Sequence, residues 1–421
     1  MPTVEGFDFF TLKFDENGTL QSGQEFDALT TRASAATDVV FIAHGFRNDE
    51  HEATELYTRF LGTLKANLAR PEFGALANRQ IVFAGVYWPS KPFRESYGDA
   101  SSGTRALDRP GATLADAREQ LEDLKANDAS TAQRENLDRA IALLPTLENN
   151  PPAQNEFVTL VWSLLDTANT DTTEALPQIR SRSGEEILAR LSPPPSHGTR
   201  GIGDVGGRIA GGVGHFLNLT KWYVMKDRSG TVGATGVAKA VRSLRANCPD
   251  VRIHVVGHSL GGRLAAACAK ALGTSPKVPL HSLMLLEAAF SHFGFSSNNG
   301  RGAAGFFRDV IEQQVVKGPF VSTFSAEDTV VGRAYSLMSR LAGDNTRAIG
   351  DERDEFGGIG RNGPLKTSEV ATVKLNPAGT PYQFKDRVIN NLDGSGGLIT
   401  NHSDVTNEAV TYAFASAMLR T

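Results

Sequence analysis

The stretch VRIHVVGHSLGGRLAAACA, Val251–Ala269, decides how this chain folds. It begins with apolar residues typical of a buried strand, passes through the motif GHSLG (257–261), and continues with small residues at helical spacing. A serine between two glycines, where a strand meets a helix, indicates a very tight turn that exposes the hydroxyl. Side chains at the glycine positions would collide with the neighbouring strand and helix. The stretch therefore predicts a parallel sheet with a nucleophilic serine, Ser259, at the carboxyl end of a strand.

Strand and helix patterns alternate on both sides of this stretch. The apolar runs DVVFIA (38–43) and QIVFAGVY (80–87) are separated by a helical pattern, as in a βαβ unit. LHSLMLLEAA (280–289) and PFVSTFSAED (319–328) continue the alternation after it, and the last residues read as a helix. The opening FDFFTLKFDENGTL (7–20) turns at an Asn-Gly pair and predicts a hairpin strand at the sheet edge. The fold class is α/β, with a mostly parallel, doubly wound sheet.

The alternation of strand and helix patterns stops between the apolar run at 80–87 and Val251. Leucines and alanines recur there at helical spacing, separated by turn signals such as NNPP (149–152), and no strand is convincing. We therefore expect a first core segment at 1–90, a helical insertion at 91–218 and a second core segment at 219–421. A Gly-rich polar excursion is expected at about 345–380.

Composition excludes several classes of function. The chain has 421 residues, a formal net charge of -4 and no basic run, which argues against a nucleic-acid partner. Its two cysteines make neither a disulfide framework nor a zinc spacing. GIGDVG (201–206) matches a dinucleotide motif but follows no strand, so it is better read as a loop entering a helix.

The sequence predicts neither a signal peptide nor a transmembrane helix. The first residues carry acidic side chains where a signal peptide would be apolar, and no apolar run reaches the roughly 20 residues of a transmembrane helix. We expect a cytoplasmic protein without a transmembrane segment, and export by a route that needs no such signal stays open.

The motif GHSLGG resembles the nucleophile elbow of esterases and lipases in the α/β-hydrolase superfamily. The resemblance covers the strands and helices of about 36–90 and 222–340 and roughly the last 35 residues. It covers neither the helical insertion nor the Gly-rich stretch. It implies an α/β-hydrolase fold in which the insertion forms a cap.

The resemblance also implies a triad in the order nucleophile, acid, histidine. His402 precedes the final helix, where the family places its catalytic base. Asp328, on the loop after the strand FVSTFS (320–325), is the preferred acid, and Glu287, at the end of the preceding strand, is the alternative. His258 adjoins the serine in the chain, and its side chain is expected to point away. His254, inside a strand, is expected to be a satisfied core residue.

The oxyanion of an acyl intermediate would need two backbone donors. One is the N–H of Leu260, which follows the nucleophile, and the other is the N–H of Phe46, in the loop after the strand at 38–43. No metal and no organic cofactor is needed for this chemistry.

Three functions follow as hypotheses. The first is a serine hydrolase that cleaves a small-molecule or lipid carboxylic ester through a covalent acyl-enzyme. The second is a lipase or phospholipase whose insertion is a lid, and the third is a catalytically inactive binding protein that keeps the fold. Amide hydrolysis and acyl transfer use the same residues, so the sequence does not separate them from ester hydrolysis.

Overall fold

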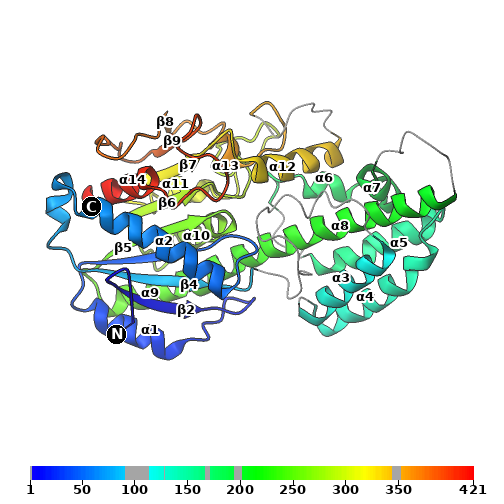
Figure 1. The fold of residues 1–421 in the computed structure, drawn as a ribbon, viewed down its shortest axis with the longest axis horizontal. Coiled ribbons are helices and arrows are strands. Elements are labelled where there is room, and N and C mark those ends of the chain that lie inside the picture. The colour runs from blue at the N-terminus through cyan, green and yellow to red at the C-terminus, as the bar shows by residue number, and fades with distance from the viewer. Residues whose placement is uncertain (1, 91–112, 128, 166–170, 194–201, 344–351) are drawn as a thin grey trace. The chain divides into compact units, whose positions relative to one another are not determined.

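The computed structural model describes residues 2–90, 113–127, 129–165, 171–193, 202–343 and 352–421. The chain forms two compact units, one built on a sheet and one helical (Figure 1). The sheet unit comprises Met1–Lys91, Arg228–Ser336 and Arg347–Thr421, and the helical unit comprises Pro92–Asp227 and Leu337–Thr346. The helical unit thus extends further along the chain than the expected insertion at 91–218, and it takes in a second segment.

A sheet of nine strands forms the centre of the first unit. The strand order is β1-β2-β4-β3-β5-β6-β7-β9-β8, and every neighbouring pair is parallel except β1 with β2. This confirms the predicted α/β class with a mostly parallel sheet, and the helical insertion falls between β4 and β5. The strands are β1 Thr3–Val4, β2 Phe7–Lys13, β3 Asp38–Ala43, β4 Ile81–Tyr87, β5 Arg252–His258, β6 Ser282–Leu286, β7 Phe320–Phe324, β8 Val370–Lys374 and β9 Ile389–Asp393.

Helices cover both faces of this sheet, which is why its central strands are mostly apolar. Every residue of β3 and β4 is buried. Helices α2 (Glu50–Leu68) and α14 (Glu408–Leu419) pack together on one face, and α1 (Gly23–Ala33), α9 (Ala238–Asn247) and α10 (Leu260–Leu272) pack on the other (Figure 1). The remaining helices are the short α11 Arg308–Glu312 and α13 Ile359–Asn362, and α12 Thr329–Ala342, which begins in the sheet unit and ends in the helical unit.

The second unit has its own apolar core. The ring of Phe216 lies 6.0 Å from that of Phe157 and 5.5 Å from that of Trp162, measured between centroids. Lys226 and Glu174 form an ion pair that is almost fully buried. Its helices are α3 Leu114–Asn127, α4 Thr131–Leu143, α5 Pro151–Val161, α6 Leu176–Arg180, α7 Gly184–Leu191 and most of α8 Ile202–Thr231. Within the described ranges, no helix combines the length and the apolar character that a bilayer span requires.

Three details of the sheet differ from expectation. Strand β2 pairs in parallel with β4 and the two-residue β1 takes the edge, so the stretch 7–20 is not an edge hairpin. The Gly-rich stretch 345–380 contributes helix α13 and strand β8, so it is only partly an excursion. Strand β9 was not expected, because its sequence INNLD lacks an apolar run. Its asparagines are nevertheless buried, and their side-chain amides donate to Phe320 O at 3.2 Å and to Thr372 Oγ1 at 3.1 Å.

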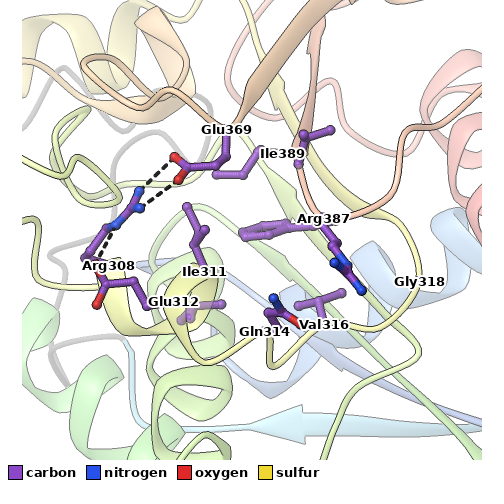
Figure 2. A pocket seen from close by; sticks show the side chains of 12 residues that line it. Arg308, Ile311, Glu312, Gln314, Val316, Gly318, Glu369, Arg387 and Ile389 are labelled. Carbon is purple, nitrogen blue, oxygen red and sulfur yellow. Dashed lines mark hydrogen bonds and ion pairs between the residues drawn. The ribbon is translucent and has the colours of Figure 1, made fainter.

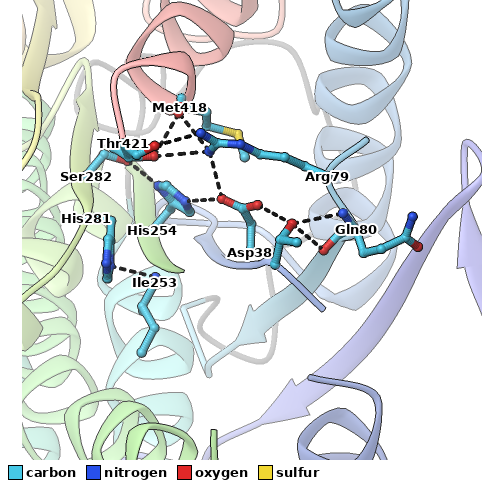
Figure 3. Close-up of polar contacts among 10 residues, drawn as sticks. Asp38, Arg79, Gln80, Ile253, His254, His281, Ser282, Met418 and Thr421 are labelled. Carbon is cyan, nitrogen blue, oxygen red and sulfur yellow. Dashed lines mark hydrogen bonds and ion pairs between the residues drawn. The ribbon is translucent and has the colours of Figure 1, made fainter. Parts of the chain in front are cut away.

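A buried polar chain joins the amino ends of β3, β5 and β6 (Figure 3). His254 Nε2 lies 3.1 Å from Asp38 Oδ1, and His254 Nδ1 lies 2.7 Å from Ser282 Oγ. Because a carboxylate only accepts, Nε2 carries the proton and Nδ1 accepts from the serine hydroxyl. Arg79 donates to Asp38 at 3.1 Å and to the main-chain oxygen of Thr421 at 2.6 Å. His254 is therefore a satisfied core residue, as expected.

We predict that the sheet unit loses stability steeply in mild acid. Burial lowers the pKa of His254, against the opposing effect of Asp38, and it lowers four further histidine pKa values: His44 and His281 to about 4, His258 and His292 to about 3. Each folded pKa is below the unfolded value of about 6.5, so this stability is present above pH 6.5 and is lost as the pH falls toward 4.

Urea unfolding at several pH values measures this loss. At pH 5 the buried His44, His258 and His292 each contribute a slope of about 1.4 kcal/mol per pH unit, and the half-buried His281 contributes less. His254→Gln should make the slope shallower, whereas His51→Gln, which removes an exposed histidine from α2, should leave it unchanged. A free energy of unfolding that stays flat between pH 7 and pH 5 would contradict the prediction.

Candidate functional site

Ser259 lies in a strained turn between β5 and α10. Its φ of 58° and ψ of -124° place a non-glycine residue in a region that side chains rarely adopt. Two hydrogen bonds to the end of β6 hold it: Ser259 N donates to Leu286 O at 3.0 Å, and Ala289 N donates to Ser259 O at 3.0 Å. The side chain is 4% exposed. The local fold of the predicted elbow is therefore present, and neighbouring strands maintain its strain.

Glycines allow three segments of chain to meet at this turn. A Cβ on Gly257 would lie 2.1 Å from Gly261 O, and one on Gly261 would lie 2.3 Å from His44 O. A Cβ on Gly45 would lie 2.6 Å from the Cβ of Ser259. Such distances are far shorter than any real carbon contact, so no larger residue fits without backbone movement. The serine, the start of α10 and the loop after β3 are thus packed backbone to backbone.

The loop after β3 is fixed beside the serine. Ala43 pairs with Gly257 in the parallel register, so the next residues of the two strands, His44 and His258, lie side by side. Trp88 stacks on His44 with ring centroids 5.6 Å apart, and its Nε1 donates to His44 O at 3.1 Å. These contacts hold the backbone that leads into Phe46 against the elbow. Since α10 begins at Leu260, the N–H of Leu260 has no acceptor within that helix.

Asp328 and His402 form a buried pair. His402 Nδ1 lies 2.8 Å from Asp328 Oδ2, with Asp328 fully buried and His402 8% exposed. The other carboxylate oxygen accepts from Val331 N at 2.9 Å, so Asp328 caps the first turn of α12, where the helix dipole favours negative charge. A carboxylate cannot donate, so Nδ1 of His402 carries the proton and Nε2 is a proton acceptor.

Among the residues that the structure describes, Ser259 and His402 are not directly bonded to each other. The described residues show no hydrogen bond between Ser259 Oγ and His402 Nε2, although His258, next to Ser259 in the chain, bonds to the main chain of His402. In unliganded hydrolytic sites this contact is often long, and it closes when substrate binds. The arrangement therefore supplies a histidine oriented by Asp328 and tied through His258 to the buried turn that holds Ser259.

Glu287, the alternative acid, is bonded elsewhere. It is fully buried with a φ of 44°, and its Oε1 accepts from Thr323 Oγ1 at 3.1 Å. Its Oε2 has no partner among the residues described. Burial, and after it the nearby charge of Asp328, raises the pKa of Glu287 well above its ordinary value. Burial and the nearby Asp328 thus both oppose a charge on Glu287, and the structure pairs His402 with Asp328 instead.

His258 is a member of the site that the sequence did not single out. Its Nε2 lies 2.8 Å from the main-chain oxygen of His402, and the two rings lie 4.8 Å apart between centroids. The sequence suggested only that its side chain points away from the serine. No local signal could have found the contact, because it joins the end of β5 to a loop more than a hundred residues later.

A pocket of about 250 Å³ lies at the amino ends of β7 and β9 (Figure 2). Apolar side chains such as Phe320 and Ile389 line it. Arg308 also lines it and forms a bidentate ion pair with Glu369, in which two guanidinium nitrogens lie 2.7 and 2.8 Å from the two carboxylate oxygens. Ser259 follows the carboxyl end of β5. Because these strands are parallel, the pocket and the predicted triad lie at opposite ends of the strands. None of the predicted catalytic residues lines it.

Comparison with known proteins gives no match: no family model, no curated protein and no solved structure is detectably similar to this chain.

We predict that Gly261→Ala disrupts the elbow. The added methyl would meet the main-chain oxygens of Ala43 and His44 at 2.4 and 2.3 Å, so backbone must shift, at a cost of at least about 2 kcal/mol of unfolding free energy. Gly23→Ala is the matched control, because nothing lies within 4 Å of the added carbon. Denaturant unfolding of both variants checks the prediction, and equal stability of the two would contradict it.

Proposed function

We propose that this chain is a serine hydrolase of the α/β-hydrolase type that cleaves a carboxylic ester through a covalent acyl-enzyme. The observation that carries the proposal is the strained Ser259 turn, at the same edge of the sheet as a buried Asp328–His402 pair. Strain of this kind persists where the surrounding structure enforces it, and functional sites are where it concentrates. A merely structural turn would not need a buried, helix-capped carboxylate holding a histidine with its second ring nitrogen unprotonated.

The proposed reaction has two halves. Ser259 Oγ attacks the ester carbonyl carbon while His402 Nε2 takes the hydroxyl proton, and Asp328 stabilises the resulting imidazolium. The tetrahedral oxyanion accepts hydrogen bonds from the N–H groups of Leu260 and Phe46. Collapse expels the alcohol, which receives the proton from His402. Water then attacks the acyl-enzyme with His402 again as base, and the carboxylic acid product leaves with Ser259 restored.

The substrate class in this proposal is a small-molecule or lipid ester. An experiment can distinguish a carboxylesterase from a lipase whose helical unit is a lid. A lipase accelerates when its substrate exceeds the solubility limit, and a carboxylesterase does not. A panel of esters of increasing acyl length, measured on both sides of that limit, makes the distinction.

We predict that a fluorophosphonate adds once to the native protein and not to Ser259→Ala. The reagent phosphorylates only a serine whose hydroxyl is activated by a neighbouring base. Intact-mass spectrometry before and after incubation measures the adduct. A folded native protein that gains no mass would argue for the inactive binding protein, and an adduct on Ser259→Ala would place the nucleophile elsewhere.

We predict unequal effects for the two buried acids. Asp328→Asn should lower kcat/KM by about 10⁴-fold, because asparagine no longer favours the tautomer with the proton on Nδ1. Glu287→Gln should change kcat/KM by less than about tenfold, since Glu287 is bonded to Thr323 while the histidine is bonded to Asp328. Hydrolysis of a chromogenic ester measures both variants. The assignment of the acid is wrong if the larger loss belongs to Glu287→Gln.

A further inference from the structure

The ring of His258 is held in one protonation state by its contacts. It is 5% exposed, and its Nε2 lies 2.8 Å from the main-chain oxygen of His402. A carbonyl oxygen can only accept, so Nε2 carries the proton. Nδ1 is then a bare acceptor, and it has no partner among the residues that the structure describes. His258 therefore acts toward His402 as a neutral hydrogen-bond donor.

The neutrality of His258 matters to its neighbour. Burial first, and the adjacent His402 second, lower the pKa of His258 to about 3. The two ring centroids are 4.8 Å apart. A charged ring at that distance would repel the imidazolium that His402 must become when it accepts the serine proton. A neutral ring leaves that step unopposed.

The loop that carries His402 has few other attachments. Several hydrogen bonds of residues 400–404 run within the loop itself, as from Thr400 N to Asp404 Oδ2 at 3.0 Å and from Ser403 N to Asn401 Oδ1 at 3.0 Å. Asn407, just before α14, donates to Asp404 O at 2.8 Å and to Asp404 Oδ1 at 3.1 Å. Among the described residues, the bonds from this segment to more distant parts of the chain come from His402: the ring reaches Asp328, and the main-chain oxygen reaches His258. The side chain and the backbone of His402 are thus each fixed by one bond.

We propose that His258 is the positioning residue for the catalytic base. Its ring holds the backbone of His402 while Asp328 holds the imidazole, so the end of β5 sets the position of both the nucleophile and the base. This inference rests on the proposed hydrolase function. His258 does not touch the reacting atoms, and its effect on the reaction passes through His402.

A matched pair of substitutions tests the donor. His258→Met and His258→Gln have the same length, and only glutamine offers an N–H at the position of Nε2. We expect His258→Met to lower the rate of fluorophosphonate labelling of Ser259 by about 10- to 100-fold, as small misplacements of catalytic groups do. Glutamine should restore most of that rate. With an ester substrate the loss should fall on kcat and leave KM within about twofold, because positioning of the base does not alter binding.

Hydrogen exchange of the segment 398–407 gives a second readout that does not require activity. Exchange should speed up in His258→Met and return toward the native rate in His258→Gln. Should the methionine variant not fold, His258→Asn replaces it, because its shorter amide does not reach the carbonyl. Native labelling and exchange in folded His258→Met, or a glutamine variant as impaired as methionine, would overturn the inference. If the native protein is not labelled at all, the hydrolase function fails, and hydrogen exchange alone then decides whether His258 holds the loop.

Discussion

Backbone contact at the carboxyl end of β5 is the constraint on which the rest of this structure depends. Gly257, Gly261 and Gly45 let the strand, the following helix and the loop after β3 approach more closely than any side chain would permit. That approach holds Ser259 at a positive φ of 58°, directly after the carboxyl end of β5. It also places the first amides of α10 beside the loop that contains Phe46. In the reaction that we propose, one packing requirement would thus position both the nucleophile and the donors for an oxyanion.

The buried polar groups around the turn differ in their surroundings. Asp328 accepts hydrogen bonds from the first turn of α12 and from His402, whereas burial, and after it Asp328 itself, raises the pKa of the equally buried Glu287. Burial lowers the pKa of His258 to about 3, so its ring is neutral. The pair that would carry charge during catalysis is therefore surrounded by groups that do not compete with it, which is the separation of protonation states that acid–base chemistry requires.

Much of this arrangement could be predicted from the sequence, because it follows from local patterns. The apolar runs of β3, β4, β5, β6 and β7, and the Gly-Ser-Gly turn, are visible in consecutive residues. Strand β9 was missed because Asn390 and Asn391 replace apolar burial with side-chain hydrogen bonds to other strands. The choice between Asp328 and Glu287 and the contact of His258 with His402 depend on which loops meet across the sheet. Neither is encoded in nearby residues, so the sequence left the first open and did not reveal the second.

The most direct test of the account is a crystal structure of the protein inhibited by a small phosphonate ester. We predict that phosphorus is bonded to Ser259 Oγ and that its non-bridging oxygen lies about 2.7–3.1 Å from the N–H groups of both Leu260 and Phe46. The Nε2 atom of His402 should lie beside the serine oxygen, with Asp328 still bonded to Nδ1. An adduct whose oxygen points to solvent and meets neither amide, or one on another residue, would contradict the claim that this turn is an active site.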